Sequence, residues 1–231
     1  KIFQLYTVRF YKDKAKEFIK SSAPLADRMR PKNLDEFVGQ GHLVGKGRFL
    51  RNLIEKKEIP SLILWGPTGI GKTTLANIIA ETTGSRFMSF SAVLSGVKEI
   101  REVIKEAKDG LLYNKRKTIL FVDEIHRFNK SQQDAFLHHV EDGTITLIGA
   151  TTENPSFEIN APLLSRCKVL VLKQLTEGDL KRIIQSALSD KERGLGGYNL
   201  EIQDNVLDVI AQYSHGDARS ALNSIETAVM I

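Results

Sequence analysis

The stretch with the clearest chemistry is glycine-rich and ends in a lysine and two threonines. Residues 66–74 read GPTGIGKTT, and the first eight fit the pattern G-x-x-x-x-G-K-T. Glycines let successive backbone N–H groups point toward a polyphosphate, and the following helix adds the positive end of its dipole. Lys72 can reach the β and γ phosphates, and the Thr73 hydroxyl can join a magnesium shell. We therefore predict a nucleotide site formed by Gly66, Pro67, Thr68, Gly69, Ile70, Gly71, Lys72, Thr73 and Thr74.

A second reactive pair ends the apolar run TILFVD. Asp123 is its last residue and Glu124 follows directly. We expect Asp123 to hold Mg²⁺ through water, and Glu124 to polarise the water that attacks the phosphate. Together with the glycine-rich loop, the pair predicts hydrolysis as well as binding of the nucleotide.

Two neighbouring patterns resemble other sites without completing them. DEIH (residues 123–126) resembles a DExH helicase box, but the remaining helicase motifs are not evident, so we assign His126 to local packing or coupling. NKSQ (residues 129–132) resembles the guanine-reading N-K-x-D, with Gln132 where an aspartate would accept from the guanine ring. The substitution favours ATP over GTP.

The sequence gives no sign of a zinc site. One cysteine, Cys167, cannot complete a structural zinc centre, and the histidines lack partners at metal-binding spacing. They are His42, His126, His138, His139 and His215. We therefore expect no zinc.

Strands and helices must alternate to position these groups. Short apolar runs predict strands, and helical periodicities lie between them, which favours a parallel sheet covered on both faces. The expected strands are residues 61–65, 86–91, 118–123, 144–150 and 168–172. After about residue 175 the strands stop, and capped helix starts are expected at Thr176 with Asp179 and at Asp204, followed by an apolar stripe over 218–229.

Composition sets the wider class. The 231 residues are 42% hydrophobic and 26% charged, as in a soluble globular protein, and the single cysteine fits a reducing compartment. No apolar run could span a bilayer, so we expect a cytoplasmic protein, or a nuclear one in a eukaryote. Residues 1–20 carry six Lys/Arg against two Asp/Glu, so most of the net charge of +5 lies there. We interpret them as a solvated basic arm or the remnant of a tag, and the whole sequence as a fragment.

The order of these motifs resembles a known family. Residues 121–167, FVDEIHRFNKSQQDAFLHHVEDGTITLIGATTENPSFEINAPLLSRC, and GDARSALN at 216–223 resemble AAA+ ATPases of the clamp-loader-like branch. They are most similar to the family of replication-associated recombination protein A and its eukaryotic Werner-helicase-interacting relatives. The resemblance implies an α/β P-loop core, with a five-stranded parallel sheet between helices, over residues 21–174. It implies a small all-helical lid over 175–231.

The resemblance also implies further roles. ADRMRPKNLDEFVGQGHLVG (residues 26–45) resembles the segment near the adenine, which assigns Val38 to nucleotide binding. Thr152 resembles sensor 1, with Thr151 as the fallback. Arg166 resembles the arginine finger that reaches a neighbouring subunit, and Arg219 resembles sensor 2, which points at the γ phosphate of its own subunit.

The resemblance to this family also implies a function. We expect a Mg²⁺-dependent ATPase that remodels DNA or DNA-bound proteins at stalled or damaged replication forks. The implied partners are single-stranded, gapped or forked DNA, single-strand-binding protein and the replisome, with a homo-oligomer, a tetramer, for the longer protein. Alternatives are a RuvB-like branch-migration motor, a clamp-loader-type subunit and a non-catalytic scaffold that binds nucleotide.

Overall fold

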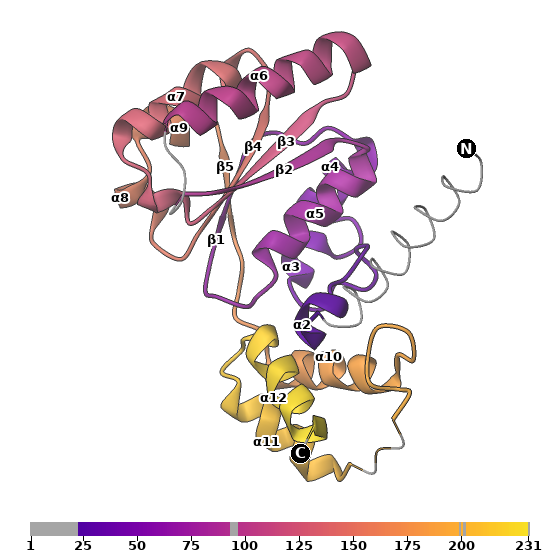
Figure 1. Cartoon of the computed structure of the whole chain (residues 1–231). Helices are drawn as coiled ribbons and strands as arrows, with labels where there is room; N and C mark the ends of the chain where they lie inside the picture. Colours follow the sequence, from indigo (N-terminus) through magenta and orange to yellow (C-terminus); the bar gives the residue numbers. More distant parts are fainter. Residues whose placement is uncertain (1–22, 93–96, 199, 201, 231) are drawn as a thin grey trace, which may run out of the picture. The chain divides into compact units, whose positions relative to one another are not determined.

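The computed structural model describes residues 23–92, 97–198, 200 and 202–230 (Figure 1). Contacts within the chain divide it into two units, which are described separately here. The α/β unit runs from Pro31 to Leu175, and the helical unit comprises residues 176–230 together with residues 23–30. The expected basic arm at residues 1–20 lies outside the described residues.

The α/β unit contains a five-stranded parallel sheet in the order β2-β3-β4-β1-β5, which confirms the expected fold class. Its strands are β1 (Leu62–Trp65), β2 (Arg86–Ser91), β3 (Thr118–Asp123), β4 (Thr146–Thr151) and β5 (Lys168–Val171). β4 lies between β3 and β1, and Trp65 at the end of β1 stands opposite Thr151 at the end of β4. In a parallel sheet the carboxyl ends of all strands share one edge, so the segments that follow β1, β3 and β4 start side by side.

Helices cover both faces of this sheet (Figure 1), with α4 and α5 on one side and α6 and α7 on the other. The helical segments are α3 (Gly41–Val44), α4 (Phe49–Lys56), α5 (Lys72–Thr83), α6 (Val97–Asn114), α7 (Lys130–Glu141), α8 (Pro155–Glu158) and α9 (Ala161–Leu164). Double coverage explains why the central strand β3 is almost continuously apolar, since its residues 118–122 are all buried.

Helix α7 begins where the sequence resembled a guanine-reading motif. Asn129 Oδ1 accepts from the Gln132 N–H at 2.9 Å, and Gln132 Oε1 accepts from the Asn129 N–H at 3.0 Å. The two side chains therefore form a reciprocal capping box, which satisfies N–H groups at the start of α7. This is the local reason for a glutamine at position 132.

The helical unit contains α10 (Glu177–Ser189), α11 (Asp204–Tyr213), α12 (Ala218–Met230) and the short α2 (Leu25–Arg28). Its core includes Leu25, Leu180, Ile184, Leu222 and Ile225. The expected cap at Thr176 is confirmed, because its hydroxyl accepts from the Asp179 N–H at 3.1 Å. The expected start at residue 204 is also the first residue of α11.

The boundary between the units differs from the expected one. Both carboxylate oxygens of Glu226 accept from the Leu25 N–H at 2.9 Å, and Arg28 donates to one of them at 3.1 Å. Residues 23–30 therefore group with the helices rather than with the sheet, where the sequence placed them. Within the described residues, no helix combines the length and apolarity that a membrane span requires.

Candidate nucleotide site

The glycine-rich loop joins β1 to α5 in a conformation that requires glycine. Gly71 has φ +95°, and a Cβ there would lie 2.8 Å from the Phe37 ring. A Cβ on Gly66 would lie 2.4 Å from the carbonyl oxygen of Leu172. The backbone thus passes closer to its neighbours than any side chain allows, and the loop turns sharply into the N-terminus of α5.

Lys72 is the first residue of α5 and is buried, with 8% of its surface exposed. Its ammonium group donates to the carbonyl oxygens of Gly66 and Pro67, at 2.6 Å in each case. A buried cation needs partners of this kind. These two hydrogen bonds hold the ammonium group of Lys72 against the glycine-rich loop, where the predicted phosphates would bind.

The acidic pair lies at the same edge of the sheet. Asp123 ends β3, and one of its carboxylate oxygens accepts from the Glu124 N–H at 3.1 Å. Glu124 has φ +52°, in the left-handed region that residues other than glycine seldom adopt. This turn ends the strand and leads into the 3₁₀ segment η1 (Ile125–Arg127).

His126 connects this acidic turn to the next strand. Its Nδ1 lies 2.9 Å from the Thr151 hydroxyl, and its Nε2 lies 3.4 Å from a carboxylate oxygen of Glu124. The Thr151 hydroxyl also accepts from the Glu153 N–H at 3.0 Å and lies 3.3 Å from the Glu153 carbonyl oxygen. His126 therefore lies between Thr151 at the end of β4 and the Glu124 carboxylate.

The contact with His126 distinguishes the two threonines at the end of β4. Thr151 is fully buried and bonded to His126, while Thr152, one residue further, is half-buried. The sequence proposed Thr152 as the sensor and Thr151 as the fallback. The internal bonds of Thr151 favour Thr152 for that role, which stays a prediction.

The segment expected near the adenine lies against the loop. Phe37 contacts Gly71, and Gln40 exchanges hydrogen bonds with the backbone of Lys173 at 2.6 and 2.9 Å. Val38 lies between them in sequence and is half-buried. These anchors on both sides fit the predicted role of Val38, which the structure does not test.

Arg166 lies away from this edge. It precedes β5, and in a parallel sheet the start of a strand is at the edge opposite to the carboxyl ends. Its guanidinium group forms an ion pair with Glu141 in the last turn of α7 and donates to the Pro162 carbonyl oxygen at 2.7 Å. Such a position suits a group that serves another subunit better than one that serves its own.

Arg219 belongs to the helical unit and is exposed near the start of α12. It lines a surface hollow of about 640 Å³ together with Asp217, Ser220, Asn223, Ser224 and Thr227. All of the side chains that line it are polar or charged. Its role as sensor 2 remains a prediction.

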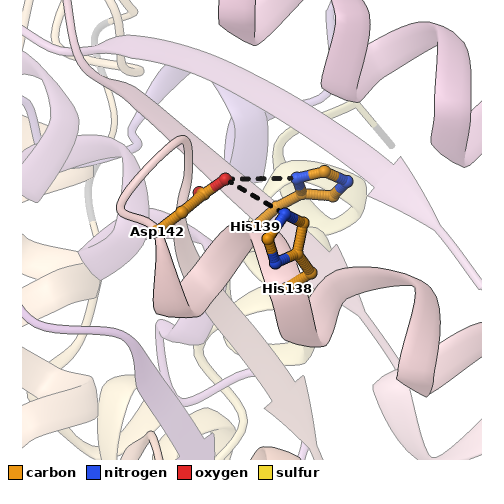
Figure 2. A group of neighbouring side chains, drawn as sticks. All are labelled: His138, His139 and Asp142. Carbon is orange, nitrogen blue, oxygen red and sulfur yellow. Dashed lines mark ion pairs between the residues drawn. The ribbon is translucent and has the colours of Figure 1, made fainter.

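One group of side chains was missed by the sequence analysis. His138, His139 and Asp142 bring two imidazoles and a carboxylate together at the end of α7 (Figure 2). The expectation that the histidines lack partners at metal-binding spacing was therefore wrong for these two. The signal was H-H-x-x-D, which places an aspartate three and four residues after the histidines and so on the same side of a helix.

The residues of the loop and of the acidic turn fit a magnesium nucleotide. Gly66, Gly69 and Gly71 carry no side chains in the loop, the ammonium group of Lys72 supplies a positive charge, and the first turn of α5 offers helix N–H groups. Thr73 and Asp123 supply the oxygen donors that Mg²⁺ prefers. The strand order, the loop after β1 and the acidic pair after β3 define a P-loop nucleotide-binding protein.

Comparisons with known proteins give the same class. Residues 62–175 match the family model "ATPase family associated with various cellular activities (AAA)". Replication-associated recombination protein A from Coxiella burnetii is 60% identical over 203 residues, and that from Haemophilus influenzae is 56% identical over 206 residues. These matches cover 88% and 89% of this chain, which spans only 46% of either relative.

Among solved structures, the Thermotoga maritima RuvB Holliday junction branch migration motor matches with a TM-score of 0.69 and 34% identity. The match covers 84% of this chain and 63% of that one. The chain therefore belongs to the AAA ATPases, in the family of replication-associated recombination protein A.

Proposed function

We propose that this chain is the nucleotide-hydrolysing part of a Mg²⁺-dependent ATPase that acts in DNA replication, recombination and repair. The observation that carries the proposal is the convergence of the loop after β1, with its buried Lys72, and the acidic pair after β3 on one edge of the sheet. The relatives are named for replication-associated recombination, and the family resemblance suggests work at stalled or damaged forks, on DNA or on DNA-bound proteins.

Each residue of the proposed site has its own role. Residues 66–74 and Val38 would hold ATP, while Thr73 and Asp123 would hold Mg²⁺, which neutralises phosphate charge when bound. Glu124 orients and polarises the attacking water, and His126 holds the Glu124 carboxylate from the side of β4. Lys72 stays protonated beside the phosphates, and Thr152 positions the water or the γ phosphate.

Two arginines complete the site from elsewhere. Arg166 would act on the nucleotide of a neighbouring subunit, and Arg219 on that of its own subunit. A planar cation that faces the charge on the transferred phosphoryl group can raise the rate by about 10³- to 10⁵-fold. The pair between Arg166 and Glu141 would have to open for this contact. Activity per subunit should therefore rise with protein concentration, and a rate that neither depends on concentration nor changes in Arg166→Ala contradicts the proposal.

Glu124→Gln is the sharpest test of hydrolysis. The amide keeps the shape of the side chain but cannot take a proton, so kcat should fall by about 10²- to 10⁴-fold while ATP binding remains. Glu81→Gln is the matched control, because Glu81 is exposed in the last turn of α5. Steady-state hydrolysis and equilibrium binding of a fluorescent ATP analogue measure the two properties. Unchanged turnover in Glu124→Gln would show that this carboxylate has no catalytic role.

The action on DNA needs its own experiment. ATP hydrolysis by the full-length protein should rise with forked or gapped DNA, single-strand-binding protein being an added partner in the assay. The partners, a homotetrameric assembly and a cytoplasmic or nuclear location are proposals that rest on the resemblance to the family. Indifference to every DNA structure would favour a scaffold that binds nucleotide without remodelling anything.

A RuvB-like motor is the rival with structural support, because the RuvB fold matches this chain. Such a motor would be expected to carry a β-hairpin insertion before the fourth strand. Here α7 ends at Glu141 and β4 begins at Thr146, with only a short turn between them. That turn favours the recombination-protein family over a branch-migration motor. A clamp-loader subunit would be recognised by loading of a sliding clamp.

A further inference from the structure

The end of helix α7 carries a group of side chains that the proposed ATPase does not use. His138 and His139 are adjacent in the last turn of the helix, Asp142 is its C-cap residue, and both imidazoles face the same carboxylate (Figure 2). His138 Nε2 lies 3.7 Å and His139 Nδ1 lies 3.8 Å from the Oδ2 atom of Asp142. We propose that these three residues form a binding site for a divalent first-row transition-metal ion, with Zn²⁺ as the reference ion.

The donor set and its spacing support this assignment. Two imidazole nitrogens and a carboxylate oxygen suit zinc, nickel or copper, whereas magnesium prefers oxygen donors alone. Donor atoms around a tetrahedral zinc lie roughly 3.3 Å apart when each bond is about 2.0–2.1 Å long. The donors of this group all lie within 4.8 Å of one another, so small rotations of the side chains would close the site.

The carboxylate is already oriented for this purpose. Its Oδ1 atom accepts from the Thr144 N–H at 2.8 Å, which leaves Oδ2 directed at the two rings. Hydrogen bonds from Thr144 lower the pKa of Asp142, so the carboxylate is ionised at neutral pH. The C-terminal end of a helix is also its negative end, which favours a bound cation.

His139 supplies the second observation. Its Nδ1 atom is buried and has no hydrogen-bond partner, since the Asp142 oxygen at 3.8 Å is too far for one. Burial, and then the positive charge of Lys108, lower the pKa of His139. A metal ion would give this buried nitrogen the close partner that no hydrogen bond supplies.

The site lies at the edge of the sheet opposite to the glycine-rich loop, because α7 leads into the start of β4. Glu141 in the same turn forms the ion pair with Arg166. An ion bound here would therefore occupy the surface that carries the proposed arginine finger. The inference itself does not depend on ATP hydrolysis.

The test is a zinc titration of the metal-free 231-residue chain by calorimetry, in an Asp123→Asn background that removes the predicted magnesium ligand. We expect one equivalent of Zn²⁺ to bind, and His138→Ala to weaken the affinity by on the order of tenfold or more. His138 is mostly exposed, so this variant should keep its fold. Asp142→Asn should weaken binding as well, although its amide oxygen can still accept from Thr144.

Two further variants separate a metal site from a helix-ending ion pair. Lys108→Gln removes an opposing positive charge and should strengthen zinc binding, while His215→Asn in the helical unit should leave it unchanged. Cobalt in place of zinc should give the visible absorption of nitrogen-ligated Co²⁺, which His138→Ala reduces. Failure to take up stoichiometric zinc, or uptake that survives both His138→Ala and Asp142→Asn, overturns the proposal.

Discussion

The polar side chains of the two units are used in different ways. At the carboxyl edge of the sheet they connect segments far apart in sequence, such as His126 with Thr151 and Gln40 with Lys173. In the helical unit several are local, and Thr176 with Asp179 and Asp190 with Arg193 are three residues apart. Long-range polar contacts also occur there, such as those of Glu226 with α2 and of Lys181 with Asp208.

Long-range contacts set the geometry of the candidate site, whereas local contacts set the stability of single helices. Contacts between strands fix the distance from one reactive group to another, so their loss should appear first in turnover. Local caps stabilise one helix each, so their loss should appear as local unfolding with little effect on the geometry of the sheet edge. Each substitution below tests one side of this contrast, beginning with the largest expected effect.

Replacing His126 should break the coupling between β3 and β4. In His126→Leu the Glu124 carboxylate loses its lateral support, and kcat should fall by up to about 10²-fold, as for a small displacement of a reacting group. KM for ATP should change little, because the nucleotide-binding loop is untouched. The measurement is steady-state hydrolysis over a range of ATP concentrations, with His215→Asn as the control in the helical unit.

Thr151→Val sharpens this test because it removes only the hydroxyl group that faces His126 Nδ1. If the two residues act through one contact, the double variant should lose no more turnover than His126→Leu alone. Fully additive losses would mean that His126 and Thr151 act independently. A rise in KM with unchanged kcat would place His126 in binding instead.

Replacing Glu226 tests a long-range contact in the helical unit, the one between α12 and α2. Glu226→Ala leaves the Leu25 N–H without its acceptor and removes one of the acceptors of the Arg28 guanidinium, so the free energy of unfolding should fall by about 1–3 kcal/mol. Glu55→Ala is the comparison, since its pair with Arg51 is solvent-exposed and should contribute much less to the free energy of unfolding. Urea unfolding followed by far-ultraviolet circular dichroism measures both. Equal effects would mean that α2 adds nothing to the stability of the helical unit.

Local signals in the sequence were sufficient to predict most of the strands and the glycine-rich loop. The expected strands over 86–91 and 118–123 match β2 and β3 at both ends. β4 starts later than expected, at Thr146, because the Asp142 carboxylate holds the Thr144 N–H in the turn after α7. Near neighbours in sequence decide such features, which is why periodicity and capping patterns predict them.

The rest depended on contacts that no local pattern encodes. His126 and Thr151 are 25 residues apart, and Leu25 and Glu226 are 201 apart. Only the strand order and the packing of helices bring such pairs together, so the residue types of the site could be predicted but the contacts between them could not. The cluster at the end of α7 is different, since its spacing is local and could have been recognised.

The smallest effect should come from the cap of α10. Thr176→Ala removes the hydroxyl that accepts from the Asp179 N–H, which should cost about 1 kcal/mol at neutral pH. Thr227→Ala is the control, because its exposed hydroxyl bonds to a carbonyl within α12, and surface changes of this kind stay within about 0.5 kcal/mol. Hydrogen exchange of the first-turn amides of α10 reports the loss directly.

The same cap predicts a dependence on pH. Burial alone would raise the pKa of Asp179, but hydrogen bonds from the Thr176 side chain and backbone, and the pair with Arg182, lower it overall. A lowered pKa in the folded state contributes stability that is fully present above the ordinary value of 3.8 and is lost as the pH falls through the folded pKa. Because Thr176→Ala removes one of these hydrogen bonds, the difference in unfolding free energy between wild type and variant should shrink below about pH 4. A difference that stays constant down to pH 2 would mean that the threonine caps the helix without stabilising the Asp179 carboxylate.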